Sequence, residues 1–247
     1  MSVTSETTNS ALASVKEFDT SQGRPSPSDS DHAPLPPLKP LLRGWIHLVT
    51  TPLAFAAALV LLILSPTAGT RWASTAYLLS TLLLFGISAL YHRGHWKPRT
   101  HAILRRFDHS NIFLLIAGTY TPISVALLDS RDSTTVLLIV WIGALLGIGT
   151  SVFWPSAPRW FTTIIYVVLG WVALWYIPQL WAAGGPAVVW LLFAGGLLYT
   201  IGAVVYALKW PDPSPKTFGF HEIFHSFTVA GWITHCVAAF LAVLSVG

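Results

Sequence analysis

Residues Ile46–Ser65 read IHLVTTPLAFAAALVLLILS, a continuous stretch without Asp, Glu, Lys or Arg. An α-helix of this length rises about 30 Å, which is the thickness of the hydrocarbon core of a bilayer. Lipid offers no water to the backbone N–H and C=O groups, so a stretch that crosses it has to satisfy these groups internally, as a helix does. Residues 46–65 therefore predict a membrane-spanning helix.

Six more uncharged runs follow, and each has about twenty residues or more. They are rich in Leu, Ala and Gly, whereas β-barrel strands would be shorter and would alternate polar with apolar residues. Pro122 and Pro178 fall inside the third and fifth runs and predict kinks there. The fold predicted is all-α, an integral membrane bundle of seven transmembrane helices in the cell membrane. Its spans are Ile46–Ser65, Ala73–His92, His109–Leu128, Thr134–Trp154, Trp160–Ala182, Pro186–Leu208 and Ile223–Val246.

The composition supports this prediction and excludes an ordinary soluble enzyme. Hydrophobic residues make up 53% of the chain and charged residues only 10%, against about a quarter in soluble domains. The single cysteine, Cys236, excludes a disulfide framework and a zinc site built from several cysteines. Residues 1–40 are different, because they are rich in Ser, Thr and Pro and predict a disordered cytoplasmic tail before a membrane domain at 41–247.

The Lys and Arg residues of the connecting segments lie mostly on one side of the predicted membrane. Ten are on the side of the N-terminus, whereas only Arg71 and Arg131 are on the other. Cytoplasmic loops carry the excess of these residues, so the N-terminus is predicted in the cytoplasm and the C-terminus outside. The basic segments suit anionic lipid headgroups, and no nucleic-acid motif accompanies them, so membrane lipids are the expected partners. The ten cations are Lys39, Arg43, Arg93, Lys97, Arg99, Arg105, Arg106, Arg159, Lys209 and Lys216.

Polar side chains that are able to carry out chemistry lie near the cytoplasmic ends of three spans. Ser88 and His92 end the second span, Asp108 precedes the third, and His221 and His225 open the seventh. Ionisable groups are costly inside a membrane, so each is a functional candidate. Residues four apart share one helix face and differ by about 6 Å in height. Because the second and seventh spans run antiparallel, His92 is expected level with His221, and Ser88 level with His225.

Three neutral imidazoles that meet in this way suit a divalent cation, and zinc is the first choice. Such a site leaves a fourth position for water, whose pKa zinc lowers towards about 7. The sequence thus predicts zinc at His92, His221 and His225, with Asp108 polarising the water and Ser88 binding the water or the substrate. The reaction predicted is hydrolysis of a lipid ester or amide.

Other interpretations of the same residues stay open. His221 and His225 would serve equally well as interfacial histidines that reach the headgroups. Asp108 would also serve as a cap at the start of the third span. The segment His221–His225 fits the zinc-protease pattern H-E-x-x-H, in which Glu222 is the general base. This reading ranks second because Asp108 offers another group to hold water.

Two further histidines are weaker candidates. His47 opens the first span in the same leaflet but has no partner at helical spacing. His235 lies about 15 Å deeper in the membrane than His225, because ten residues of helix separate them. It is expected to pack against neighbouring helices, as is Cys236.

Taken together, three motifs resemble the haemolysin III family. They are Ser88-x-x-x-His92, the segment RFDHS at 106–110 leading into GTYTP at 118–122, and HEIFH at 221–225. That family belongs with the progestin and adipoQ receptors, whose motif pattern is similar to that of alkaline ceramidases. The likeness covers about residues 41–247.

The resemblance implies seven helices, a cytoplasmic N-terminus and zinc held by His92, His221 and His225. It places Asp108 against the metal's water, with Ser88 nearby, and suggests slow hydrolysis of lipid amides, as proposed for the receptor branch. Bacterial-type members owe their name to a cytolytic or pore-forming role, and a role in membrane homeostasis is also proposed for them. The first span here begins RGWIH at 43–47 and departs from the acidic start of bacterial members.

Three functions therefore compete. The first is a zinc-dependent hydrolase that acts on a membrane lipid. The second is a pore or cytolysin, although no predicted helix carries the repeated polar stripe of a water-filled lumen. The third is a receptor-like sensor in which zinc only clamps the second span to the seventh.

Overall fold

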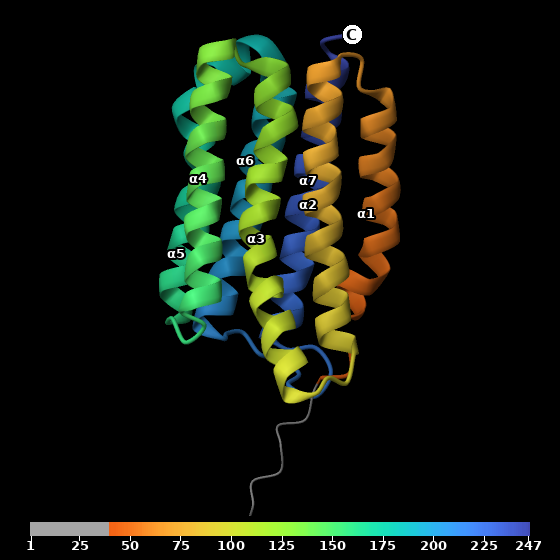
Figure 1. The fold of residues 1–247 in the computed structure, drawn as a ribbon, viewed down its shortest axis with the longest axis vertical. Helices are drawn as coiled ribbons and strands as arrows, with labels where there is room; N and C mark the ends of the chain where they lie inside the picture. Colours follow the sequence, from red (N-terminus) through yellow and green to blue (C-terminus); the bar gives the residue numbers. More distant parts are fainter. Residues whose placement is uncertain (1–39) are drawn as a thin grey trace, which may run out of the picture. The chain divides into compact units, whose positions relative to one another are not determined.

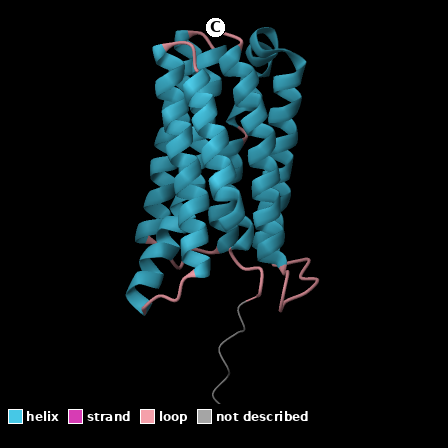
Figure 2. Ribbon diagram, turned by 90° about the vertical axis from the view of Figure 1, so that its right-hand side faces the viewer, coloured by secondary structure: helices cyan, strands magenta, loops and turns pink. Residues whose placement is uncertain are grey.

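The computed structural model describes residues 40–247, and these residues form helices without β-strands (Figure 1). The long helices run roughly along one direction, and the loops gather at the two ends of the bundle (Figure 2). The predicted tail lies outside the described residues, apart from Pro40. In chain order the helices are α1 (Trp45–Leu64), α2 (Ala68–Arg93), α3 (Pro98–Leu127), α4 (Ser130–Phe153), α5 (Arg159–Gly170), the 3-10 helix η1 (Val172–Tyr176), α6 (Ile177–Leu208) and α7 (Phe220–Leu244).

The outer surface of the bundle carries many large apolar side chains. Large side chains such as Leu146 and Phe153 are exposed to 69% and 88%, although the helices that carry them are strongly hydrophobic. A helix that is hydrophobic all round is buried either in the core of a large protein or in a membrane, and here no part of residues 40–247 covers the outer apolar faces, which indicates lipid. Six stretches of the described chain are long and apolar enough to cross a bilayer. The protein is a multi-pass, all-α membrane protein, as the sequence predicted.

One of these six stretches, Arg159–Leu208, has 50 residues and contains α5, η1 and α6. A straight helix of that length would rise about 75 Å, far more than one crossing needs. Its backbone is not straight: α5 gives way to η1 after Gly170, and Gly185 takes a positive φ of 73°, which glycine adopts without a Cβ penalty. The stretch has room for two crossings, and the seven-span count and the placement of the termini stay predictions.

Two predicted boundaries are wrong. The fifth run is not one helix with a kink at Pro178, because the helix already ends at Gly170 and Pro178 occupies the first turn of α6, where its missing N–H is no loss. The third helix begins at Pro98, so Arg99, Arg105 and Arg106 lie on α3 and not in a loop. Asp108 is therefore almost three turns inside α3 and does not cap it.

Helix α3 forms the centre of the bundle. In its apolar window 67% of the residues are buried, against 28% in α1, and α3 contacts α2, α4 and α7. One buried apolar cluster joins α1, α2 and α7 through residues such as Ala58, Phe85 and Trp232. A second joins α3, α4 and α5 through Phe113, Val140 and others. Because α1 packs on both α2 and α7, the ends of these helices lie near one another.

Candidate metal centre

The structure brings together the three histidines predicted to bind metal. His92 lies in the last turn of α2, and His221 and His225 lie in the first two turns of α7. The Nε2 atoms of His92 and His221 are 3.2 Å apart, and one ring nitrogen from each of the three residues lies within 4.8 Å of the other two. His92 and His225 are buried and His221 is half-buried. The expected match in height between His92 and His221 is confirmed.

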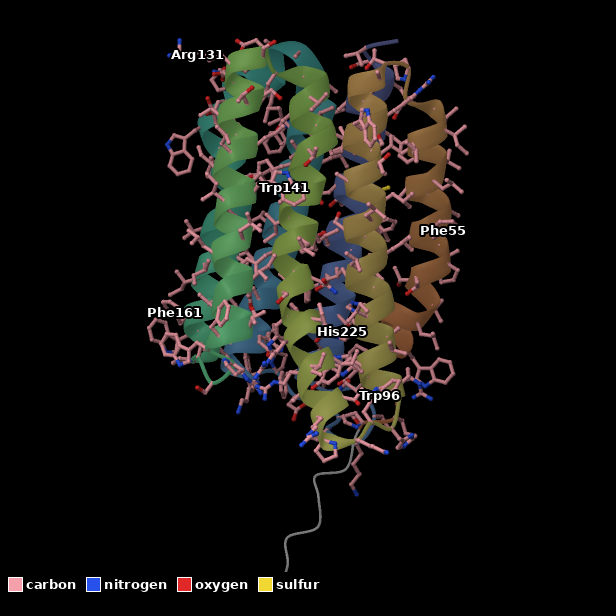
Figure 3. The ribbon with its side chains drawn as sticks, viewed as in Figure 1. Phe55, Trp96, Arg131, Trp141, Phe161 and His225 are labelled. Atoms are coloured by element: carbon pink, nitrogen blue, oxygen red, sulfur yellow. The ribbon has the colours of Figure 1, made fainter. Side chains whose placement is uncertain are left out.

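The site lies at the end of the bundle where α1 and α7 begin. Figure 3 shows His225 near the end that carries Trp96 and Phe161, far from Arg131 at the opposite end. The backbone of Gly44, just before α1, passes so close to His92 that an added Cβ would lie 2.6 Å from the His92 Cβ. Gly44 also has a φ of 81°, which glycine alone adopts readily. The chain before α1 therefore packs directly on a candidate ligand.

Asp108 reaches the same cluster from α3. Its Oδ2 atom is 3.7 Å from the His92 Nε2 atom, and its carboxylate interacts with the Ser88 hydroxyl one turn before His92 on α2. Asp108 is 9% exposed and Ser88 only 2%. Both residues predicted as catalytic therefore contact the neighbourhood of the histidines, and α3 supplies the carboxylate from its interior.

Glu222, the alternative general base, has other partners. Its Oε1 atom pairs with Arg43 Nε, and its Oε2 atom accepts the backbone N–H of Gly219 at 2.9 Å. The second contact places Glu222 as a cap of the α7 N-terminus, where a carboxylate is favoured by the helix dipole. With both oxygens engaged, Glu222 fixes the start of α7 and its contact with the segment before α1, which disfavours the zinc-protease interpretation of HEIFH.

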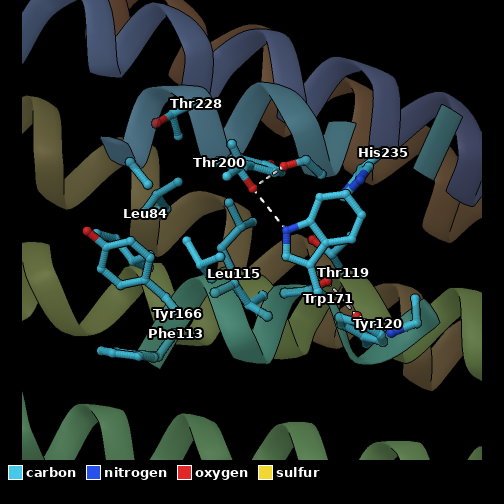
Figure 4. Close-up of a pocket in the computed structure, with 18 of the residues that line it drawn as sticks. Leu84, Phe113, Leu115, Thr119, Tyr120, Tyr166, Trp171, Thr200, Thr228 and His235 are labelled. Atoms are coloured by element: carbon cyan, nitrogen blue, oxygen red, sulfur yellow. Dashed lines mark hydrogen bonds between the residues drawn. The ribbon is translucent and has the colours of Figure 1, made fainter. Parts of the chain in front are cut away.

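A cavity of about 460 Å³ opens beside the histidine cluster. Its lining includes His225 and Asp108 at one end and Leu128 and Trp181 at the other, and the chain rises about 30 Å along α3 between Asp108 and Leu128. Figure 4 shows part of its lining, which includes Leu115, Phe113, Tyr166 and Trp171. Apolar and aromatic side chains lie there beside Thr119, Thr200 and Thr228, and Trp171 Nε1 donates to Thr200 Oγ1 at 3.0 Å. The cavity suits a long apolar chain.

Known proteins are similar to this chain in sequence. Residues 37–236 match the protein family described as haemolysin-III related. The chain belongs to the haemolysin III family. It is 36% identical to the Hemolysin-3 homolog of Bacillus subtilis (strain 168) over 188 residues, which cover 75% of this chain and 85% of the relative. It is 33% identical to Hemolysin-3 of Bacillus cereus, again over 75% of this chain, and over 83% of that protein.

A more distant relative comes from a plant. The heptahelical transmembrane protein ADIPOR2 of Oryza sativa subsp. japonica is 28% identical over 187 residues, or 68% of this chain and 80% of the relative. The haemolysin III match at 37–236 contains all the residues of the candidate centre, from Arg43 to His225. The family resemblance drawn from the sequence motifs is thereby confirmed.

The donor set of this haemolysin III protein fits a zinc ion. Tetrahedral zinc with Zn–N bonds of 2.0–2.1 Å separates its ligand nitrogens by about 3.3 Å. The His92 and His221 nitrogens already meet this spacing at 3.2 Å, and the His225 nitrogen lies within 4.8 Å of both, at most about 1.5 Å beyond it. Two neutral imidazoles at 3.2 Å would also share a hydrogen bond, so the spacing is compatible with the metal and does not require it.

One histidine is more closely involved than its sequence position suggested. The His47 ring stacks on the His225 ring with centroids 3.8 Å apart and an interplanar angle of 7°. Spacing along one helix could not reveal this pair, because its members come from α1 and α7. His235 is separate from the cluster, as expected: its Nε2 lies 3.0 Å from the Leu192 carbonyl oxygen, deep in the bundle.

Proposed function

We propose that this haemolysin III protein is a zinc-dependent hydrolase that cleaves an amide or ester bond of a membrane lipid. His92, His221 and His225 hold the ion. The observation that carries the proposal is that an apolar cavity, long enough for an acyl chain, reaches the imidazole cluster and its carboxylate. When bound, zinc supplies a Lewis acid that polarises a carbonyl group and activates water.

The protein's own residues would divide the remaining work. Asp108 is placed to orient a water molecule beside the histidines and to take up its proton, because its carboxylate lies 3.7 Å from His92. Ser88 holds the carboxylate in that position. The apolar cavity binds the lipid chain and keeps bulk water away from the reacting carbonyl. Arg105 and Arg159 line the same cavity and are exposed, so they suit the polar end of a lipid.

The test is metal analysis combined with a turnover assay on protein purified in detergent. Wild type is expected to contain close to one zinc per chain and to hydrolyse a fluorescent lipid amide. His92→Ala, His221→Ala and His225→Ala should each lose both properties. His95→Ala, which removes an exposed histidine outside the cluster, should lose neither. An unchanged zinc content in the three variants would reject the site, and full turnover in zinc-free protein would reject the reaction.

A structural zinc that clamps two helices is the second candidate. Helices α2 and α7 have few close backbone contacts, and each packs mainly on other helices. The contact between His92 and His221 adds to the ring contact between Phe85 and Trp232 in joining the two helices. This function predicts that chelation lowers the unfolding temperature in detergent and that no lipid is turned over at any zinc content.

The cytolytic alternative has less support. A conducting pore needs polar groups along its length, whereas most of the side chains that line the cavity are apolar or aromatic. The relative from Bacillus cereus bears the name Hemolysin-3, and that name is no measurement on this chain. Conductance of the purified protein in planar bilayers, absent from a heat-inactivated control, would restore this candidate.

A further inference from the structure

His47 is an unusual residue for the interior of a membrane protein. Its side chain is 2% exposed, yet at least one of its ring nitrogens has no hydrogen-bond partner among residues 40–247. A buried polar group left without a partner destabilises a fold by about 1–3 kcal/mol, so such groups call for an explanation. Phe85 meets the ring edge-on at 5.1 Å, and His225 covers one face and interacts through its backbone with one ring nitrogen at most, so at least one nitrogen keeps no partner in the described part of the chain.

The stacking shows what His47 does not do. An imidazole binds a metal in the plane of its own ring, along the nitrogen lone pair. The rings of His47 and His225 are nearly parallel and 3.8 Å apart, so an ion in the plane of His225 lies off the plane of His47. His47 is accordingly outside the group of three residues whose nitrogens converge. It lies beside the metal centre without being able to join it in this arrangement.

The cavity supplies the missing partner. His47 lines it together with Ser88, Asp108 and His225. A neutral imidazole offers one donor and one acceptor, and this matches a neutral hydrogen-bonding group such as an amide or a hydroxyl. We propose that His47 binds the amide or hydroxyl group of a lipid ligand beside the metal centre and so selects for lipids that carry such a group.

This inference rests on the proposed function, because it takes the ligand to be a lipid in the cavity. It adds a residue from α1 to a site otherwise built from α2, α3 and α7. The role is one of binding and specificity, since His47 would hold the head of the lipid while other residues carry the reaction. The acyl chain would contribute affinity without discriminating between head groups.

Competition binding with two probes of the same chain length tests the role. Oleamide carries an amide head and 1-octadecene carries none, and each displaces a fluorescent fatty acid from zinc-loaded protein in detergent. Wild type should bind oleamide more tightly than octadecene. His47→Phe keeps a flat ring for the stack but has no nitrogen, and it should reduce that ratio about fivefold, the equivalent of one lost hydrogen bond. His47→Asn retains a donor and an acceptor, so its preference for oleamide over octadecene should lie between those of wild type and His47→Phe.

Two controls make the result decisive. Thr50→Val removes a buried hydroxyl on the same helix that is bonded to the Ile46 carbonyl, and it should leave the ratio unchanged. Zinc content should equal that of wild type in His47→Phe, because His47 is no ligand. An unchanged ratio in a folded His47→Phe or His47→Asn protein overturns the inference, as does loss of zinc from both. A third outcome separates the two proposals. If purified wild type contains no zinc but prefers oleamide to octadecene, and His47→Phe removes this preference, the proposed hydrolase is overturned and this inference is supported.

Discussion

Two buried carboxylates lie at the same end of the bundle, and their surroundings are opposite. Glu222 is 1% exposed and is engaged by Arg43 and by the N-terminus of its own helix. Asp108 is 9% exposed and faces histidines and a serine at the end of the cavity. A carboxylate that is fully paired fixes the fold, whereas one left beside imidazoles and an open space is available to substrate. From this comparison we propose a structural role for Glu222 and a catalytic role for Asp108.

The largest expected effect is on the rate of turnover, and it distinguishes Asp108 from Glu222. Asp108→Asn should lower the rate of lipid-amide hydrolysis about 10²–10⁴-fold, the usual contribution of a general base, while its zinc content stays at the wild-type level. Glu222→Gln should retain the rate within about threefold wherever the protein is folded. Kinetics and metal analysis on both variants check this. The reverse result, an inactive Glu222→Gln beside an active Asp108→Asn, would restore the HEIFH segment as a protease-like motif.

The second effect concerns stability at the Glu222 contact. Arg43→Ala leaves a buried carboxylate without its cation, which costs about 3–5 kcal/mol for a fully buried pair. Arg43 is 21% exposed, so about 2–3 kcal/mol is expected here. Thermal unfolding in detergent should show a clear fall in midpoint. Arg99→Ala, an exposed arginine on α3, should change it little, and equal effects of the two substitutions would remove the structural role of the pair.

Much of this comparison could be predicted from the sequence, and some of it could not. The uncharged runs predict the helices because lipid imposes one solution on the backbone, and the i, i+4 spacing of His221 and His225 predicts a shared face. The start of α3 could not be predicted from charge, since a helix continues past the hydrocarbon into the basic segment around Arg105. The partners of Glu222 and His47 depend on contacts between helices far apart in sequence, which no local pattern contains.

A third effect tests how the start of α1 supports the centre. Gly44→Ala forces a side chain onto a backbone with positive φ, at about 1–2 kcal/mol, and places its Cβ against His92. Lower stability and weaker zinc affinity should appear together. Gly149→Ala is the matched control, because no heavy atom lies within 4 Å of the added Cβ and its backbone is helical. If Gly44→Ala bound zinc with wild-type affinity, the segment before α1 would not support the metal centre.

The smallest effect sharpens the role of Ser88. Ser88→Ala removes the hydroxyl that holds Asp108, and a single hydrogen bond of about 1 kcal/mol corresponds to roughly a fivefold loss of turnover. Zinc content should not change. Ser80→Ala, two turns earlier on α2, removes a hydroxyl bonded to the Tyr77 carbonyl and should leave turnover unaffected. Equal rates for the two variants would show that Asp108 needs no help from Ser88.

The central claim is that imidazoles from α2 and α7 bind one zinc ion. X-ray absorption at the zinc edge, on protein purified in detergent without added metal, tests it most directly. We predict a first shell with three imidazole nitrogens at 2.0–2.1 Å and one further oxygen donor, and loss of this signal in His225→Ala. Purified, folded wild type with no zinc signal, or with a shell that contains no imidazole scattering, would contradict the account.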